Sequence, residues 1–101
     1  MSREKLVRDG IPALIADLGG AAQTRKVPHD ERLPWLLSKL REECDELRET
    51  PCIEEAADVI EVLRAIADHL GLTWDEVERA REAKRAARGG FAGGVVMTMG
   101  E

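Results

Sequence analysis

The sequence predicts an all-α protein, an antiparallel helical bundle of about four helices, with a short C-terminal strand as an optional further element. Apolar residues recur at three- and four-residue steps in four separate stretches. Short connections that contain Gly or Pro join these stretches, as expected between antiparallel neighbours. The length of 101 residues fits one domain, residues 1–101, whose own core is only marginally sufficient. Association into a dimer is therefore expected.

The N-terminal third predicts one short helix and a connector. Within residues 5–18 the apolar positions include Ile11, Leu14 and Ile15. Asp9 and Pro12 mark the expected start of the regular part, and Gly19-Gly20 marks the end of the helix. Residues 21–34 contain two prolines and no helical period, so they are expected to form a connector. Within it, residues 23–27 have the character of an extended segment.

Three further helices are expected after the connector. A leucine-rich stripe over residues 33–47 predicts an amphipathic helix that breaks before Pro51. Residues 53–70 leave only a narrow polar sector, which predicts the most buried helix of the four. Thr73 followed by Glu76 fits a capping box that opens a last helix through about Arg88. After the glycine-rich residues 89–94, residues 95–99 have β-forming character and could pair with residues 23–27.

Composition excludes several classes of partner. The 15 basic and 20 acidic residues give a net charge of -5, which argues against extended electrostatic binding to the phosphate backbone of nucleic acid. Trp35, Trp74 and Phe91 are the only aromatic residues, so no set of stacking platforms for single strands exists. The absence of a signal peptide or a membrane-spanning apolar run indicates no membrane partner and a cytoplasmic protein. Cys44 and Cys52 lack metal or disulfide spacing and are expected to be reduced thiols.

Two acidic clusters, residues 42–46 and 54–58, are the most informative motifs. Residues three apart on a helix share a face, so Glu43 projects with Glu46 and Glu55 projects with Asp58. If the two helices are neighbours, four carboxylates surround one point. Such a cluster is typical of a magnesium site.

The alternative is that these acids only keep the helices hydrated, as most charged runs do. On a helical wheel, however, Glu55 and Asp58 interrupt the apolar arc of their helix. An unpaired carboxylate there needs a proton, a cation or a metal. From spacing alone, a metal site and a structural ion-pair network both remain open. Hydration explains the other acids of these helices well: Asp45, Glu49, Glu54 and Glu61.

The donor types favour a hard cation. Neither acidic pair has a His at the i+3 position, which excludes the Glu-x-x-His pattern of di-iron bundles. His29 and His69 are expected at the surface or at helix ends. Carboxylate oxygens suit Mg²⁺, with Mn²⁺ as a substitute. The last helix adds a basic face that could meet phosphate oxygens, although cations at a helix C-terminus are favourable without any ligand. Its members are Arg81, Lys84, Arg85 and Arg88.

Four ordered motifs extend over residues 5–91, with a gap at the connector. They are Lys5-Leu6-Val7-Arg8-Asp9-Gly10-Ile11-Pro12, Lys39-Leu40-Arg41-Glu42-Glu43-x-x-Glu46, Glu55-x-x-Asp58 and Lys84-x-x-x-Arg88-Gly89-Gly90-Phe91. Together these motifs resemble the MazG-like all-α nucleoside triphosphate pyrophosphohydrolases. The first is similar to the opening of a small single-domain branch often labelled phosphoribosyl-ATP pyrophosphohydrolase-like.

The resemblance implies a homodimer or homotetramer whose active site is partly built across subunits. It implies hydrolysis of nucleoside triphosphates between the α- and β-phosphates, giving a nucleoside monophosphate and pyrophosphate. It also implies a role for each motif residue: magnesium ligation by Glu43, Glu46, Glu55 and Asp58, a catalytic role for Glu42 (through a second ion or by orienting the attacking water) with Lys39, and phosphate binding by Lys39, Lys84, Arg88, Arg81 and Arg8.

The chain departs from this branch at a few positions. Gly10 stands where a Lys is usual, and Gly93-Gly94 replaces more polar residues. Val59-Ile60-Glu61 is unlike the histidine-biosynthesis enzymes, so phosphoribosyl-ATP is not the expected substrate. Housekeeping of the nucleotide pool is the expected role. The alternative is a non-catalytic nucleotide- or metal-binding helical module. Trp35 or Trp74 could stack on a base, or either could belong to the core.

Overall fold

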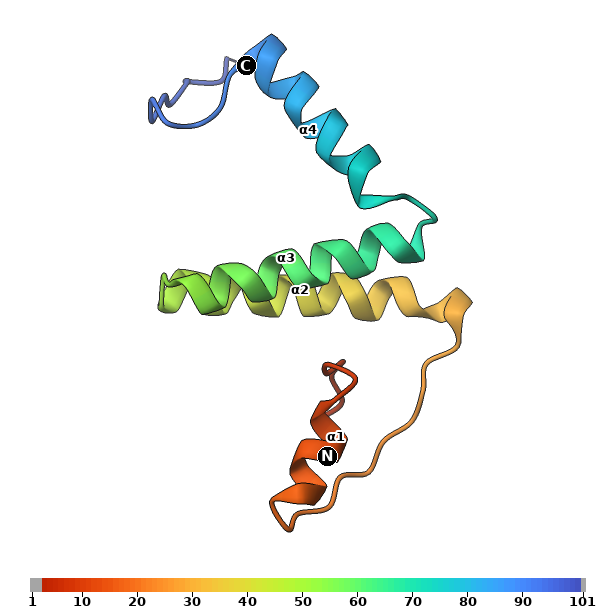
Figure 1. The fold of residues 1–101 in the computed structure, drawn as a ribbon. Helices are drawn as coiled ribbons and strands as arrows, with labels where there is room; N and C mark the ends of the chain where they lie inside the picture. The colour runs from red at the N-terminus through yellow and green to blue at the C-terminus, as the bar shows by residue number, and fades with distance from the viewer. Residues whose placement is uncertain (1–2, 101) are drawn as a thin grey trace.

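Residues 3–100 of the computed structural model are described, and they confirm the all-α prediction (Figure 1). No strand occurs within this range. In chain order the elements are α1 (Ile11–Asp17), the 3₁₀ turn η1 (His29–Glu31), α2 (Arg32–Glu49), α3 (Ile53–His69) and α4 (Trp74–Arg88).

The centre of the molecule is an antiparallel pair made by α2 and α3, which lie side by side along most of their length (Figure 1). Pro51, in the short loop between them, cannot continue α2, so the chain reverses there. Leu36 on α2 and Ala67 on α3 are the buried apolar residues of the described chain, 6% and 5% exposed. The pair therefore holds what core a single chain has.

The start of α4 confirms the predicted capping box. The Thr73 hydroxyl accepts a hydrogen bond from the Glu76 amide at 3.1 Å, and the Glu76 carboxylate accepts one from the Thr73 amide at 3.3 Å. These two bonds satisfy backbone donors that the first helical turn leaves free. At the other end, Gly89 has a positive φ of 85°, a conformation that favours glycine, and the helix stops at Arg88.

The first helix begins at Ile11, close to the start that Asp9 and Pro12 predict. Pro12 explains the start, because its ring clashes with the carbonyl four residues upstream and would disrupt a helix continued through Arg8. Residues 3–8 are therefore not helical and form a segment that runs past the α2–α3 pair. We call residues 3–8 the N-terminal segment.

The prediction of strands at residues 23–27 and 95–99 is wrong, because both segments lack regular structure. Their geometry gives the reason. The connector descends on the α1 side of the molecule, whereas the C-terminal tail lies beyond α4 on the opposite side (Figure 1). A short strand needs a partner within hydrogen-bonding distance, and the α2–α3 pair separates these two segments.

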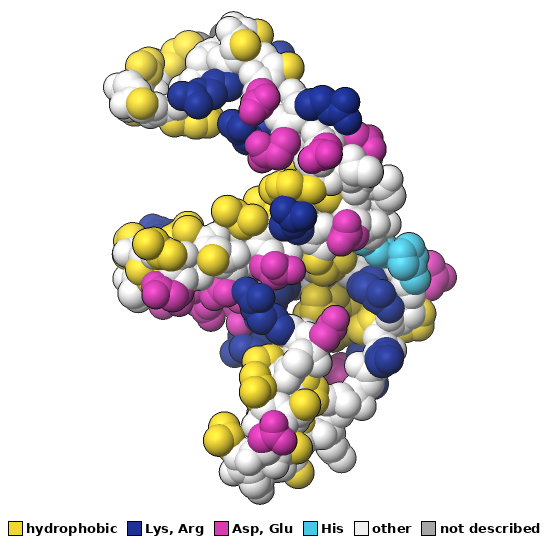
Figure 2. All heavy atoms as spheres, viewed as in Figure 1, with side chains coloured by type: hydrophobic (Ala, Val, Ile, Leu, Met, Phe, Trp, Pro, Cys, Tyr) yellow, Lys and Arg dark blue, Asp and Glu magenta, His cyan; other side chains and the backbone are white. Residues whose placement is uncertain are grey.

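The single chain is open. The helices agree with the bundle prediction in number and in the antiparallel central pair, but α1 and α4 diverge from that pair on opposite sides (Figure 1). The radius of gyration is 17.5 Å, against about 13 Å for a compact domain of this length. The prediction that α3 is the most buried helix is not met in one chain, since α3 has one buried residue, Ala67, whereas α2 has two, Leu36 and Glu43. On α3, Ile60 is 50% exposed and Leu63 is 38% exposed. Apolar side chains accordingly appear on the surface along α3 (Figure 2).

Candidate metal and phosphate site

The α2–α3 pair brings the predicted carboxylates together. Glu43 and Glu46 come from the C-terminal half of α2, and Glu55 and Asp58 come from the first turns of α3. The tight reversal at Pro51 sets these two helix halves opposite each other. One carboxylate oxygen from each residue lies within 4.8 Å of the others. We call these four residues the acidic quartet, and it is a group that could hold a metal ion.

Burial makes the ionised form of the acidic quartet energetically unfavourable unless a positive charge compensates it. Glu43 is only 6% exposed, and one oxygen of Glu43 and one of Glu55 are buried without a hydrogen-bond partner in the described chain. A hydrogen bond with Glu43, together with its negative charge, raises the pKa of Glu46. The quartet therefore favours either a bound proton or a bound cation.

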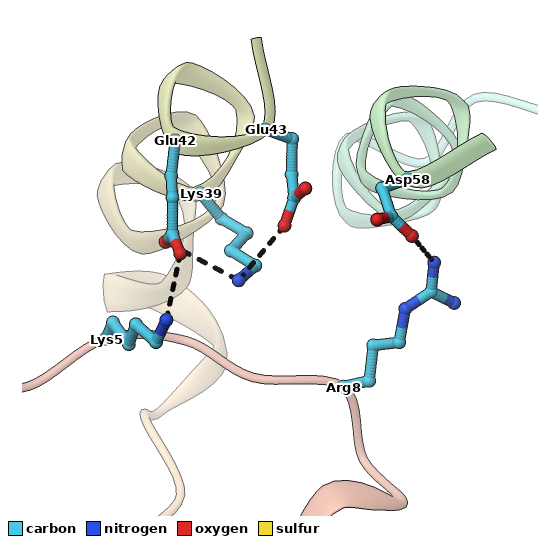
Figure 3. A network of polar contacts seen from close by, with 6 residues as sticks. All are labelled: Lys5, Arg8, Lys39, Glu42, Glu43 and Asp58. Atoms are coloured by element: carbon cyan, nitrogen blue, oxygen red, sulfur yellow. Dashed lines mark hydrogen bonds and ion pairs between the residues drawn. The ribbon is translucent and has the colours of Figure 1, made fainter. Parts of the chain in front are cut away.

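Three basic side chains border the carboxylates (Figure 3). The Lys39 ammonium lies 3.2 Å from a Glu43 oxygen and 3.5 Å from a Glu42 oxygen. From the N-terminal segment, Lys5 contacts Glu42 at 2.9 Å. Arg8 of the same segment reaches the opposite helix and contacts Asp58 at 2.6 Å. The segment thus bridges the two helices at the acidic site.

The charges of this site are incompletely balanced. The acidic quartet and Glu42 supply five carboxylates, and the three basic side chains supply three positive charges. Full ionisation leaves two negative charges in excess, which is the charge that one divalent cation neutralises. The orphaned oxygens of Glu43 and Glu55 offer ligand atoms that no basic side chain uses. The residues present therefore fit a hard divalent ion.

Glu42 differs electrostatically from the quartet. A hydrogen bond from Lys5 lowers the pKa of the Glu42 carboxyl, and the charges of Lys39 and Lys5 act in the same direction. The same contact with Glu42 raises the pKa of Lys5. Glu42 accordingly stays ionised at neutral pH, at the edge of the quartet rather than within it.

The structure leaves the predicted basic face of α4 away from this site. The N-terminal segment contacts the acids from the α1 side, and α4 lies on the opposite side of the central pair (Figure 1). Arg81 pairs within its own helix, with Glu78 at 2.9 Å and Glu82 at 3.6 Å. Lys84 and Arg88 are exposed and form no ion pair among residues 3–100. Of the predicted residues outside the quartet, the described chain places Glu42, Lys39 and Arg8 at the site and leaves Arg81, Lys84 and Arg88 away from it.

Lys5 is the site residue that sequence reasoning missed. Lys5 belongs to the opening motif, but it lies outside any helix. Helical periodicity therefore could not predict the direction in which its side chain points. Its partner Glu42 is 37 residues away. The available signal was the pair of basic residues Lys5 and Arg8 in a segment that a following proline keeps out of the helix.

The histidines and cysteines do not join the acidic site. The rings of His29 and His69 stack on each other with centroids 4.3 Å apart, which links η1 to the end of α3. Cys44 and Cys52 are free thiols, as predicted, and both are exposed. The cation-binding candidate is therefore made of oxygen ligands.

No helix within residues 3–100 is both long enough and apolar enough to span a lipid bilayer.

Comparison of the chain with family models, curated proteins and solved structures gave no match. The fold and the site together define the class as an all-helical protein with four clustered carboxylates that could hold a metal ion.

Proposed function

We propose that this protein is a magnesium-dependent nucleoside triphosphate pyrophosphohydrolase of the MazG-like type. It would cleave between the α- and β-phosphates and release a nucleoside monophosphate and pyrophosphate. The observation that carries the proposal is the convergence of four carboxylates from α2 and α3, two of them with orphaned buried oxygens, beside three basic side chains. A metal–triphosphate complex requires both kinds of group at one place.

The donor set supports magnesium as the ion. All four groups of the quartet are carboxylates, which are hard oxygen ligands, and neither histidine nor cysteine belongs to the set. Manganese prefers the same ligands and is the expected substitute. When bound, the ion would polarise a phosphoryl group and lower the pKa of a coordinated water.

The chain's own residues would bind and orient the substrate. Lys39 projects from α2 over the acids and would contact phosphate oxygens while it still neutralises Glu43. Arg8 would release Asp58 and bind a phosphate oxygen instead, because a guanidinium group can form bidentate hydrogen bonds with either a carboxylate or a phosphate. Glu42 remains ionised through its contact with Lys5 and would accept a proton from the attacking water.

The active site would be completed in a homodimer or homotetramer. Lys84 and Arg88 face solvent in one chain, and the apolar surface of α3 is largely uncovered. A second copy packed against α3 would bury that surface, and its α4 would add the missing basic groups to the phosphate site. The substrates of such an enzyme are cytoplasmic nucleotides, and nucleotide-pool housekeeping in the cytoplasm is the role that fits.

The test is a panel of ribo- and deoxyribonucleoside triphosphates with Mg²⁺ or Mn²⁺, with pyrophosphate and orthophosphate measured separately. We expect pyrophosphate as the product and no turnover after chelation of the metal. Asp58→Asn and Glu55→Gln should each reduce kcat at least about 100-fold, since loss of a ligand or charge stabiliser at a reacting phosphate has effects of that order. Glu54→Gln is the matched control, because Glu54 neighbours Glu55 on α3 but is exposed and outside the quartet.

Two results would refute the proposal. One is orthophosphate as the only product, which would mean cleavage at the terminal phosphate. The other is normal turnover in Asp58→Asn, because the quartet would then be dispensable.

A non-catalytic regulator or interaction module is the second candidate. The observation that favours it is that Lys39 and Arg8 already pair with Glu43 and Asp58, as in a structural ion network. This candidate predicts a melting temperature indifferent to Mg²⁺. Stabilisation by Mg²⁺ that grows further with added nucleotide would exclude a purely structural network.

A further inference from the structure

A surface pocket of about 310 Å³ lies directly beside the acidic site. One wall is the N-terminal segment, which includes Lys5, and the other is the first half of α2, which includes Trp35 and Lys39. Glu42, the partner of both lysines, also lines it. The pocket and the proposed phosphate site therefore share three side chains and form one continuous surface.

We infer that this pocket receives the nucleoside part of the substrate, with the base stacked on Trp35. The inference rests on the proposed function and extends it from the phosphates to the rest of the ligand.

The order of groups along α2 supports this orientation. Trp35, Lys39 and Glu43 are four residues apart in turn, so they follow one face of the helix. At 1.5 Å per residue, Lys39 lies about 6 Å and Glu43 about 12 Å along the axis from Trp35. The helix therefore carries an aromatic ring, then a cation, then a carboxylate of the quartet. A metal-bound nucleotide has its base, its phosphates and its metal in the same order.

The setting of Trp35 is that of a binding platform rather than a core residue. Its side chain is only partly buried and lines the pocket. The Arg25 guanidinium lies over its ring, 5.4 Å from the centroid, and the Glu4 carboxylate holds that guanidinium at 2.9 and 3.1 Å. Arg25 does not line the pocket, so this stack fixes the ring without filling the space. A ring held in this way loses little conformational freedom when a base binds.

The pocket's size and lining limit the ligand to a single nucleoside. A volume of about 310 Å³ is at the lower end of the range for small-molecule sites. Trp35 and Leu6 offer apolar surface, while Ser38 and Glu4 offer hydrogen-bonding groups at the edge. This is the combination that binds a flat heterocycle with a hydroxylated sugar.

Trp74 provides a matched control. It is also partly buried and lies under an arginine, with Arg64 4.9 Å from its ring centroid, but it does not line this pocket. The chain has two tryptophans, so Trp74→Phe leaves Trp35 as the sole indole and Trp35→Phe leaves Trp74. Each indole can be followed separately by its fluorescence.

The binding experiment compares two probes in the presence of Mg²⁺. One is a nucleoside triphosphate with a methylene group in place of the α–β bridging oxygen, which resists cleavage there. The other is inorganic tripolyphosphate, which lacks a nucleoside. The nucleotide should quench Trp35 emission in the Trp74→Phe variant, whereas tripolyphosphate should not. Trp74 emission in the Trp35→Phe variant should respond to neither. Equal responses of Trp35 to both probes, or no response to the nucleotide, would overturn the inference.

Kinetics give a second measurement. Trp35→Leu should raise KM for nucleoside triphosphates on the order of tenfold, the loss expected for one base–aromatic stack, and change kcat by less than about threefold. Trp35→Phe keeps a smaller ring and should raise KM less than Trp35→Leu does, whereas Trp74→Leu, outside the pocket, should stay near wild type. Hydrolysis that is indifferent to Trp35→Leu would overturn the inference and leave the proposed function intact. If the nucleotide selectively quenches Trp35 but the protein shows no turnover, the proposed catalytic function is refuted and the inference about the nucleoside pocket stands, because fluorescence measures binding without catalysis.

Discussion

At the scale of single residues, the acidic quartet assembles because two geometric rules act together. Spacing of three residues places each pair on one helical face, and the reversal at Pro51 sets the two faces opposite each other. Glu43 then becomes 6% exposed beside three other acids. Such a group has a strongly pH-dependent and cation-dependent stability.

Glu46→Gln tests this dependence. The pKa of Glu46 is raised in the folded protein by Glu43, so the native state holds this proton more tightly than the unfolded chain does. Its stabilising contribution is complete below the unfolded pKa and is lost as pH rises through the raised folded pKa. Without metal, Glu46→Gln should therefore melt higher than wild type at neutral pH, and the difference should shrink toward acid pH.

Thermal melts of metal-free protein across the acidic to neutral range measure this difference. Glu61→Gln on exposed α3 surface is the control and should follow wild type. With Mg²⁺ present the order should reverse, because wild type gains a ligand that the variant lacks. A Glu46→Gln variant that melts below wild type at neutral pH without metal would contradict the electrostatic account of the quartet.

The residue contacts that sequence reasoning could not supply are those of the N-terminal segment. Helical spacing predicts the quartet because both pairs lie within regular elements. Lys5 and Arg8 lie outside any helix, and their partners are 37 and 50 residues away. The N-terminal segment has no periodic apolar pattern, so its sequence does not indicate which side chains point toward the rest of the protein. Its contacts depend on where the segment crosses the α2–α3 pair.

At the scale of elements, local chemistry explains the helix boundaries better than the apolar pattern does. Thr73 and Glu76 define the start of α4, and Gly89 follows its end. Asp9 and Pro12 mark the start of α1, although the apolar period extends upstream to Leu6. The expected strands fail for a different reason, since β-forming character in residues 95–99 has no effect without a neighbouring strand.

Thr73→Ala tests the capping box. The variant loses the hydroxyl that accepts the Glu76 amide, which should weaken the first turn of α4 by about 1 kcal/mol. The effect should be local, because α4 diverges from α3 beyond its start (Figure 1). Amide hydrogen exchange should therefore accelerate at residues 75–77 and remain unchanged in the centres of α2 and α3.

Thr50→Ala is the control for the capping box, because Thr50 also flanks a helix but makes no side-chain hydrogen bond within the described chain. Unaltered exchange at the start of α4 in Thr73→Ala would contradict the capping role. Uniform acceleration over the whole molecule would contradict the local character of α4.

At the scale of the whole molecule, the chain is more open than its composition implies. Hydrophobic residues make up 44% of the sequence, yet the described residues bury only Leu36 and Ala67 among them. Sequence patterning indicates which faces are apolar but not whether the same chain or another covers them. The length of 101 residues was the signal for association, because small chains bury a small fraction of their surface.

Ile60→Glu tests association through α3. Ile60 is 50% exposed in the single chain, so a charge there costs little in a monomer but should disrupt an apolar interface between copies. Wild type should sediment as a dimer or tetramer, and Ile60→Glu should shift toward the mass of one chain. Val96→Glu is the control, since Val96 is 94% exposed in the C-terminal tail. Wild type that remains one chain at high concentration would contradict the proposed assembly.

The scarcity of buried apolar residues has a consequence for how the protein responds to its own abundance. Leu36 and Ala67 alone make a thin interior, so covering α3 with a second copy would supply much of the stability of the fold. By mass action, the assembled fraction of such a protein rises with total concentration. Halving synthesis of the chain in a cell would then lower the amount of assembled protein by more than half, and the unassembled remainder would be the form exposed to proteases.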